Sequence, residues 1–240
     1  MGAYESVPEK PTKKKMGCGS SKIIYDKFTT LAQITDQLRL AGLESCDMII
    51  GVDYTASNDS SGKSSFGGRS LHYLGIENPY QHVMSTIVRT LDRFDDDKQI
   101  PVFGFGDLTT RNEKVFPLSA RPDYCCNGLD DVLAHYTRTT PYVTLSGPTS
   151  FAPLIKTAVN IVKRTGRYHI LLIITDGVVS SPDYDAEAIV EASRYGLSIV
   201  CIGFSCVLTC IFFRCVSANS PRIFLLFFLS MSNRNSLINF

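Results

Sequence analysis

The chain has 240 residues, of which 44% are hydrophobic and 20% are charged. This size allows one α/β domain with a sizeable core and short tails, and it leaves little room for two full domains. The formal net charge is +1, and the 24 lysines and arginines are spread along the chain instead of forming a basic stripe. The composition therefore argues against nucleic-acid binding.

The eight cysteines show no regular disulfide framework, and no secretory signal pattern precedes them. We therefore expect reduced thiols in an intracellular protein of the cytoplasm, the inner plasma-membrane surface or the nucleus. No C-x-x-C pair occurs, and none of the four histidines lies beside a cysteine pair. This pattern does not predict a structural zinc site.

Residues 1–24 are polar and rich in lysine, which predicts a disordered basic arm. Gly2 fits the loose pattern for N-myristoylation. Gly17 fits it better if translation starts at Met16, and Cys18 then adds a site for palmitate. Acyl chains beside basic residues would hold the arm on a membrane surface, and the alternative is a disordered tail with a chance motif.

Helical patterns alternate with continuous apolar runs between residues 29 and 203. Apolar residues at helical spacing predict helices over 29–41, 80–94, 128–138, 150–164 and 185–194. Runs typical of strands buried on both faces cover 48–52, 100–106, 168–175 and 197–203. Residues 54–70 are expected to form a polar loop. The alternation predicts an α/β fold with a doubly wound, mostly parallel sheet and helices on both faces.

The chain changes character after Phe204, where an atypical hydrophobic tail, residues 205–240, has no regular alternation and no functional interpretation. The uncharged stretch 197–213 reaches only the lower limit for a membrane span, and a sheet strand explains its first part better. The expected organisation is a basic arm (1–24), an α/β domain (25–204) and this tail.

Three segments place oxygen-bearing side chains at the ends of predicted strands or at the start of a helix. Asp53, Thr55 and Ser57 follow the first strand, Thr149 lies near the amino end of a helix, and Asp176 ends the third strand. Because the carboxyl ends of parallel strands meet at one edge, these groups are expected to converge. Such hard oxygen ligands suit Mg²⁺, Mn²⁺ or Ca²⁺ and not Zn²⁺. The cation would keep an open position for an acidic group of a partner protein.

Each segment alone has an ordinary explanation as a loop, a helix cap or a turn, so the prediction depends on all three together. Asp107 ends the second strand near the same edge. It either supports the cation through the ligands that bind it, or it is an exposed carboxylate in a turn.

The metal-ion-dependent adhesion site of von Willebrand A domains resembles three segments of this chain: Asp53-x-Thr55-x-Ser57, Gly147-Pro148-Thr149 and Thr175-Asp176-Gly177. The sequence of residues 25–203 as a whole is similar to copine domains, and most similar to the copine domains of plant RING-type ubiquitin ligases. This resemblance implies a von Willebrand A fold and metal-dependent protein binding, with ubiquitin-pathway substrates as further partners. Thr55 stands where serine is commoner, and it keeps the hydroxyl.

In the ligases, the domain is followed by further sheet and helix and then by a RING that recruits the ubiquitin-conjugating enzyme. This chain departs from that pattern after Gly203, and without paired C-x-x-C motifs we expect no two-zinc RING. The main hypothesis is therefore a binding module, and the alternative is an enzyme of ubiquitin transfer. The last strand and helix of that fold are expected to be missing or replaced, and their loss would expose an unpaired sheet edge and an apolar face.

Other chemistries are less well supported. Gly62-Lys63-Ser64 resembles a P-loop but lacks the required earlier glycine, and Cys125-Cys126 has no context for nucleophilic catalysis. His169 opens an apolar strand and is expected to be structural. The acidic run 92–98 lacks EF-hand spacing and is expected to be a solvated helix end.

Overall fold

The computed structural model describes residues 30–177 and 179–204 together with strand 225–228. The basic arm, with Gly2, Gly17 and Cys18, lies outside the described residues, as does most of the 205–240 tail. In the described part of the chain, no helix combines the length and apolar character needed to cross a bilayer.

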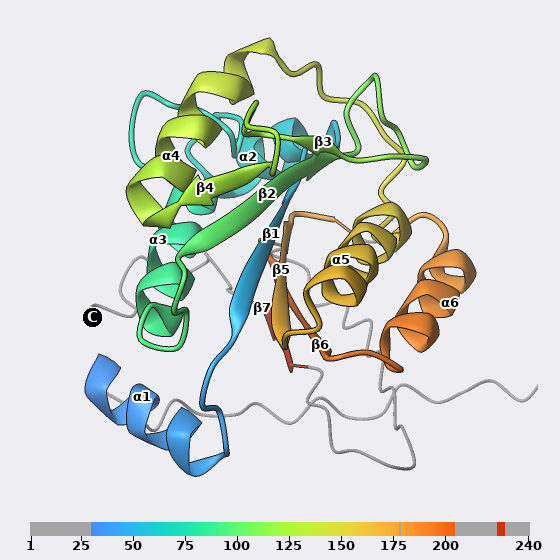
Figure 1. The fold of residues 1–240 in the computed structure, drawn as a ribbon. Helices are drawn as coiled ribbons and strands as arrows, with labels where there is room; N and C mark the ends of the chain where they lie inside the picture. Colours follow the sequence, from blue (N-terminus) through green and yellow to red (C-terminus); the bar gives the residue numbers. More distant parts are fainter. Residues whose placement is uncertain (1–29, 178, 205–224, 229–240) are drawn as a thin grey trace, which may run out of the picture.

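A seven-stranded sheet forms the centre of this structure (Figure 1). Its strands are β1 (Asp47–Asp53), β2 (Gln99–Phe105), β3 (Phe116–Pro117), β4 (Cys125–Asn127), β5 (His169–Thr175), β6 (Leu197–Gly203) and β7 (Leu225–Phe228). Their order is β3-β2-β1-β5-β6-β7, and β4 also pairs with β2. Only β3 and β4 run antiparallel to their neighbour among the described strands, so the predicted mostly parallel sheet is confirmed.

Helices cover both faces of the sheet, as predicted. They are α1 (Leu31–Leu40), α2 (Ser57–Ser65), α3 (Pro79–Leu91), α4 (Gly128–Thr139), the short 3-10 helix η1 (Thr140–Tyr142), α5 (Ala152–Thr165) and α6 (Pro182–Ala192). Figure 1 shows α3 and α4 on one face and α5 and α6 on the other. α1 lies beside α3.

The expected polar loop over 54–70 is wrong, because α2 lies within it. Its sequence is rich in serine and has no apolar periodicity, so the pattern gives no sign of a helix. Contacts with neighbouring segments hold it instead. Asn58 Nδ2 donates to the carbonyl of Asp53, and a β-carbon at Gly62 would lie 2.1 Å from the carbonyl oxygen of Arg69.

The expected unpaired edge beyond β6 is also wrong. β7 pairs with β6 in parallel, with Val200 opposite Leu225 and Gly203 opposite Phe228. A four-residue strand inside an apolar clump has no alternation that would distinguish it from a buried helix segment. Strands β3 and β4 are too short to leave a pattern in the sequence, for the same reason.

Successive residues of β1 pack into two different cores, because strand side chains alternate between the faces of a sheet. Ile50 and Val52 belong to the core beneath α3 and α4, whereas Ile49 belongs to the core beneath α5 and α6. Gly51 faces α5, where a β-carbon would lie 2.1 Å from Cδ2 of the buried Leu154. Glycine therefore allows α5 to approach the central strand closely.

Gly51→Ala should lower the free energy of unfolding by about 1 to 3 kcal/mol, because the added methyl group overlaps the packed side chain of Leu154. Leu154→Ala alone should lower it by about 2 to 5 kcal/mol through lost packing. In the double variant the new methyl group enters the cavity, so the combined loss should be smaller than the sum of the two single losses. Urea denaturation of the four proteins measures this coupling, and strictly additive losses would contradict the contact.

Candidate metal centre

The candidate metal ligands lie at the carboxyl ends of the two central strands. β1 lies between β2 and β5, and the chain runs to β2 on one side before it returns to β5 on the other. Such a topological switch point is where open α/β sheets bind ligands. Asp53 is the last residue of β1, and Asp176 directly follows β5. The loop before Thr149 reaches the same edge, since Ser146 forms a β-bridge with Thr55.

Hydrogen bonds connect four of the five predicted ligands. Ser57 Oγ donates to Asp176 Oδ1 over 2.8 Å, so the 2.9 Å contact between Thr55 Oγ1 and Ser57 Oγ has Thr55 as its donor. The backbone N–H of Thr55 donates to Asp53 Oδ1 over 2.8 Å. The hydroxyl of Thr175 donates to Asp53 Oδ2 over 2.5 Å. One continuous polar cluster therefore joins the ends of β1 and β5.

Thr149 reaches this cluster from the loop before α5. A β-carbon at Gly177 would lie 3.4 Å from Ser57 Oγ and 3.7 Å from Thr149 Oγ1, so the two hydroxyl oxygens lie near the same point beside Gly177. Reciprocal hydrogen bonds with Ser180 hold the Thr149 backbone in place, at 2.8 Å to its carbonyl and 3.3 Å from its N–H. The structure thus brings all five predicted residues to one edge of the sheet.

The charge at this edge is not fully compensated by the described protein groups. Asp53 is 0% exposed and Asp176 is 4% exposed, and Asp176 Oδ2 is buried without a hydrogen-bond partner in the described structure. Burial, followed by the nearby charge of Asp176, raises the pKa of Asp53 to about 6. Burial also raises the pKa of Asp176, and the nearby hydroxyls of Ser61 and Ser57 offset only part of this effect. Two buried carboxylates with an oxygen left unpaired fit a divalent cation, which would supply the missing positive charge.

A buried aromatic network, not predicted from the sequence, holds the backbone carbonyl of Asp53. His72 Nε2 lies 2.8 Å from that oxygen and must donate to it, while Nδ1 lies 2.8 Å from the hydroxyl of Tyr136. Burial lowers the pKa of His72 to about 4, which keeps the ring neutral. The ring stacks between Tyr54 and Tyr80, with centroid distances of 4.7 and 4.2 Å. No local pattern marks these residues, because the network connects four separate segments.

Asp107 directs its carboxylate into its own turn. Its oxygens accept hydrogen bonds from the backbone N–H groups and hydroxyls of Thr109 and Thr110. The residue is only 5% exposed, so the alternative of an exposed turn carboxylate is wrong. Its neighbour Gly106, at φ +79°, supports Thr55 directly, because a β-carbon there would lie 2.4 Å from Thr55 Cγ2. A role of Asp107 toward the cation stays a prediction.

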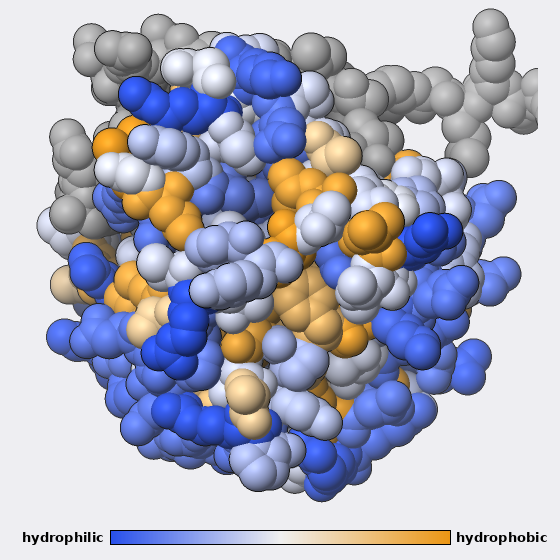
Figure 2. Space-filling model, turned by 90° about the horizontal axis from the view of Figure 1, so that it is seen from above, coloured by the Kyte–Doolittle hydropathy of each residue, from blue (hydrophilic) through white to orange (hydrophobic). Residues whose placement is uncertain are grey.

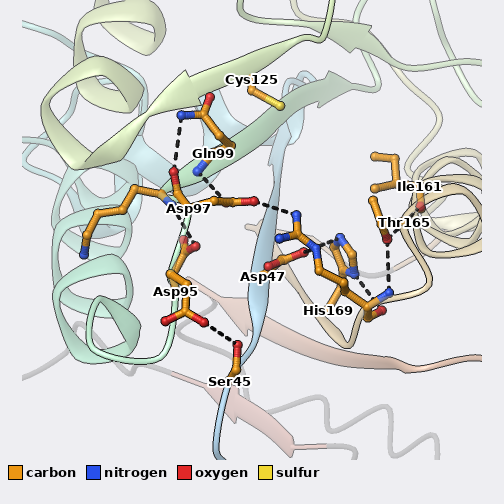
Figure 3. Close-up of polar contacts among 12 residues, drawn as sticks. Ser45, Asp47, Asp95, Asp97, Gln99, Cys125, Ile161, Thr165 and His169 are labelled. Carbon is orange, nitrogen blue, oxygen red and sulfur yellow. Dashed lines mark hydrogen bonds and ion pairs between the residues drawn. The ribbon is translucent and has the colours of Figure 1, made fainter.

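A second group of acidic side chains lies at the opposite, amino end of the central strands (Figure 3). Arg167 bridges two of them, with Nε 2.7 Å from Asp47 Oδ2 and Nη2 2.5 Å from Asp97 Oδ2. His169 is buried, with Nε2 3.2 Å from the same Asp47 oxygen, so its expected structural role fits these contacts. Asp95 is also buried, at 2% exposed, so the acidic run 92–98 is only partly the solvated helix end that the sequence indicated.

The remaining candidates do not form catalytic sites in the described structure. Gly62-Lys63-Ser64 lies inside α2 and not in a loop between a strand and a helix, which a P-loop requires. Burial raises the pKa of the Cys125 thiol, and it raises that of Cys126 to about 12. Neither thiol is therefore set up as a nucleophile.

Comparison with known proteins assigns the family. The copine family model matches residues 70–205, which is more than half of the chain. The chain belongs to the copine family. The chain is 46% identical over 206 residues to the E3 ubiquitin-protein ligase RGLG4 of Arabidopsis thaliana, covering 80% of this chain and 50% of that protein. It is 44% identical over 190 residues to copine family protein 1 of Caenorhabditis elegans, covering 78% and 17%.

The chain spans about half the length of the curated ligase relatives it matches. Its neighbours among solved structures include von Willebrand A domains. A von Willebrand factor type A protein from Catenulispora acidiphila matches with a TM-score of 0.46 at 16% identity, over 68% of this chain and 34% of that one. The manganese-loaded TRAP protein of Plasmodium vivax matches with a TM-score of 0.42 at 14% identity, over 67% and 57%.

Asp53→Asn should stabilise the metal-free copine domain at neutral pH. The folded-state pKa of Asp53, about 6, lies above its ordinary value of 3.8, so the native state holds this proton longer than the unfolded chain does. The stability that the raised pKa of Asp53 contributes is therefore lost as pH rises from about 4 to about 6. A shift of this size corresponds to roughly 3 kcal/mol at pH 7.

Urea denaturation with a chelator present, at pH 4 and at pH 7, measures this effect. The difference between Asp53→Asn and the unchanged protein should grow from pH 4 to pH 7. A difference that stays constant over this range would show that Asp53 has an ordinary pKa in the folded protein.

Proposed function

We propose that the copine domain is a protein-binding module that depends on a divalent cation, Mg²⁺ or Ca²⁺. The cation would bind an acidic side chain of a partner protein. The residues that would hold the cation are Asp53, Thr55, Ser57, Thr149 and Asp176. The observation that carries this proposal is the buried Asp176 Oδ2, which has no hydrogen-bond partner among the described residues and belongs to the same cluster as the Ser57 hydroxyl.

The donor set suits the capture of an additional anion. Three of the five groups are neutral hydroxyls, so the ligands carry at most two negative charges and a bound divalent cation would not be over-compensated. A carboxylate of a partner protein is a hard oxygen ligand of the kind that such cations accept. The protein's own contribution is to fix the oxygen atoms, through the Thr55 N–H and the Thr175 hydroxyl on Asp53.

The surface around this edge supports contact with a protein. Figure 2 looks down on the end of the molecule to which the carboxyl ends of the strands point, and it shows apolar groups gathered between polar ones. Leu108, which follows Asp107 directly, is 49% exposed. The partner's acidic side chain would therefore be expected to lie among apolar residues, which can pack against the apolar groups of this surface. A purely charged segment would lack those apolar contacts.

Calorimetric titration of the full chain with Mg²⁺ and with Ca²⁺ tests the cation site. We expect one binding event for at least one of the ions, and Asp53→Ala combined with Asp176→Ala should abolish it, because both carboxylates would be lost. Asp59→Asn is the matched control, since Asp59 is an exposed carboxylate on α2 and none of the contacts in the cluster involves it. Equal loss in the control, or unchanged binding in the double variant, would contradict the proposal.

A second candidate function, ubiquitin transfer, is favoured by the names of the Arabidopsis relatives, which are E3 ubiquitin-protein ligases. The 240 residues contain no C-x-x-C pair for the zinc ions of a RING. We therefore expect that this chain, supplied with activating enzyme, conjugating enzyme and ubiquitin, forms no ubiquitin chains. Clear chain formation in that assay would favour the enzyme over the binding module.

We further propose that the module works at the inner surface of the plasma membrane, held by an acylated arm. The motifs that support this are the glycines at 2 and 17 and the cysteine at 18, beside basic residues. Intact-mass measurement on the protein from its own cells tests it. A mass without any acyl group would contradict membrane anchoring through the arm.

A further inference from the structure

Three side chains of different chemistry meet where β4 passes into α4. Cys126 is the middle residue of β4 and pairs with Ile100 of β2. Asp131 and His135 lie one turn apart on α4, a spacing that places both side chains on the same side of a helix. One candidate ligand atom of each residue lies within 4.8 Å of those of the other two.

The hydrogen bonds around these residues involve only one of the three candidate ligand groups, the Asp131 carboxylate, and only through its oxygen Oδ2. Asp131 Oδ2 accepts from Arg121 Nη1 over 2.5 Å and from the N–H of Asn127 over 2.8 Å. Its other oxygen, Oδ1, lies 3.5 Å from His135 Nε2, which is beyond a normal hydrogen bond. No hydrogen bond to the Cys126 thiol or to the His135 ring is found among the described residues. Cys126 is 0% exposed and His135 is 9% exposed.

We propose that Cys126, Asp131 and His135 form a second metal site, which takes a transition-metal ion of the zinc class. A thiolate, an imidazole and a carboxylate are the three ligand types that zinc uses in proteins, whereas Mg²⁺ and Ca²⁺ prefer oxygen alone. Binding would replace the thiol proton of Cys126 with the metal ion and release that proton to solvent.

The geometry is within reach of a tetrahedral site. Zinc bonds of about 2.0 to 2.3 Å place neighbouring ligand atoms about 3.3 to 3.8 Å apart, so atoms within 4.8 Å need only small side-chain rotations. The hydrogen bonds from Arg121 and Asn127 already orient the Asp131 carboxylate, as supporting groups do around protein metal sites. The Asp131 side chain is 23% exposed, so solvent reaches this residue and water would be the fourth ligand of a bound ion.

The acidic group of Figure 3 does not make an equivalent site. Its members Asp47, Asp95 and Asp97 also lie close together, but Arg167 already forms ion pairs with two of them. A cation there would have to displace a bound guanidinium. At the Cys126 site Arg121 binds only Oδ2 of Asp131, so Oδ1 remains available to a metal ion.

Co²⁺ binding to the full chain tests the proposal, in a background of Asp53→Ala with Asp176→Ala that removes the proposed Mg²⁺ or Ca²⁺ ligands. A cobalt–thiolate bond gives an intense near-ultraviolet charge-transfer band, which oxygen ligands do not give. We expect this band to form and to disappear when Zn²⁺ is added. The background protein lacks the proposed Mg²⁺ or Ca²⁺ site at the strand ends. Failure to bind Co²⁺ therefore leaves the proposed function untouched, and failure of the calorimetric test of that function leaves the Cys126 site untouched.

Matched variants identify the ligands. Cys126→Ser and His135→Gln should each weaken Co²⁺ and Zn²⁺ affinity by about tenfold or more, since each removes a ligand from a three-residue set. The controls are Cys125→Ser, which removes the adjacent half-buried thiol, and His82→Gln, which removes a half-exposed imidazole near Glu77. Both controls should bind as the background does.

Circular dichroism of each variant distinguishes loss of the site from loss of the fold. If Cys126→Ser unfolds, His135→Gln still tests whether the metal ion binds at this site. Glutamine keeps much of the volume of histidine, so this variant is expected to stay folded. Absence of the charge-transfer band in the folded background protein would overturn the proposal. Equal loss of the band in Cys125→Ser would show adventitious thiol binding and would overturn it as well.

Discussion

Two carboxylates buried at the ends of neighbouring parallel strands are the constraint on which this structure depends. Asp53 and Asp176 leave water almost completely, and each charge makes the other more costly to bury. Hydrogen bonds from the Thr55 N–H, the Thr175 hydroxyl and the Ser57 hydroxyl offset part of that cost. The part that remains is largest when no cation is present, so the proposed cation site would link stability, pH and metal binding at a single edge of the sheet.

The rest of the fold keeps these two groups in register. β1 and β5 pair over six residue positions, so the two strand ends cannot shift relative to each other without breaking the centre of the sheet. Gly51 allows α5 to pack against β1, and α5 begins directly after the loop that holds Thr149. On the other face, His72 and Tyr80 hold the Asp53 carbonyl through hydrogen bonds. The same packing that stabilises the domain therefore orients its polar edge.

Much of this arrangement could be predicted from the sequence, because it follows from strand ends. Buried parallel strands have continuous apolar runs, and the polar residues that follow them must meet at one edge. These two rules suffice to predict that Asp53 and Asp176 lie near each other. Thr149 precedes a helix, and the resemblance to von Willebrand A domains adds it to the pair. The two rules could not predict α2, whose serines lack periodicity, or the His72 network, whose members come from separate segments. Such contacts depend on tertiary packing and leave no local pattern.

The Cys126 group shows a different limit of sequence patterns. Its residues are close in sequence, but the common zinc motifs contain cysteine pairs at C-x-x-C spacing, and this chain has none. Only the hydrogen bonds reveal that Asp131 Oδ2 accepts from Arg121 and Asn127, while Oδ1 lies near His135. A mixed group of this kind therefore becomes visible only when the side chains are placed in space.

A crystal structure of the full chain grown with Mn²⁺ tests the cation site at the strand ends most directly, because the ion can be located by its anomalous scattering. We expect a peak enclosed by the Ser57 and Thr149 hydroxyls and Asp176 Oδ2. No peak at that edge, in crystals where manganese is bound elsewhere on the same molecule, would contradict the site.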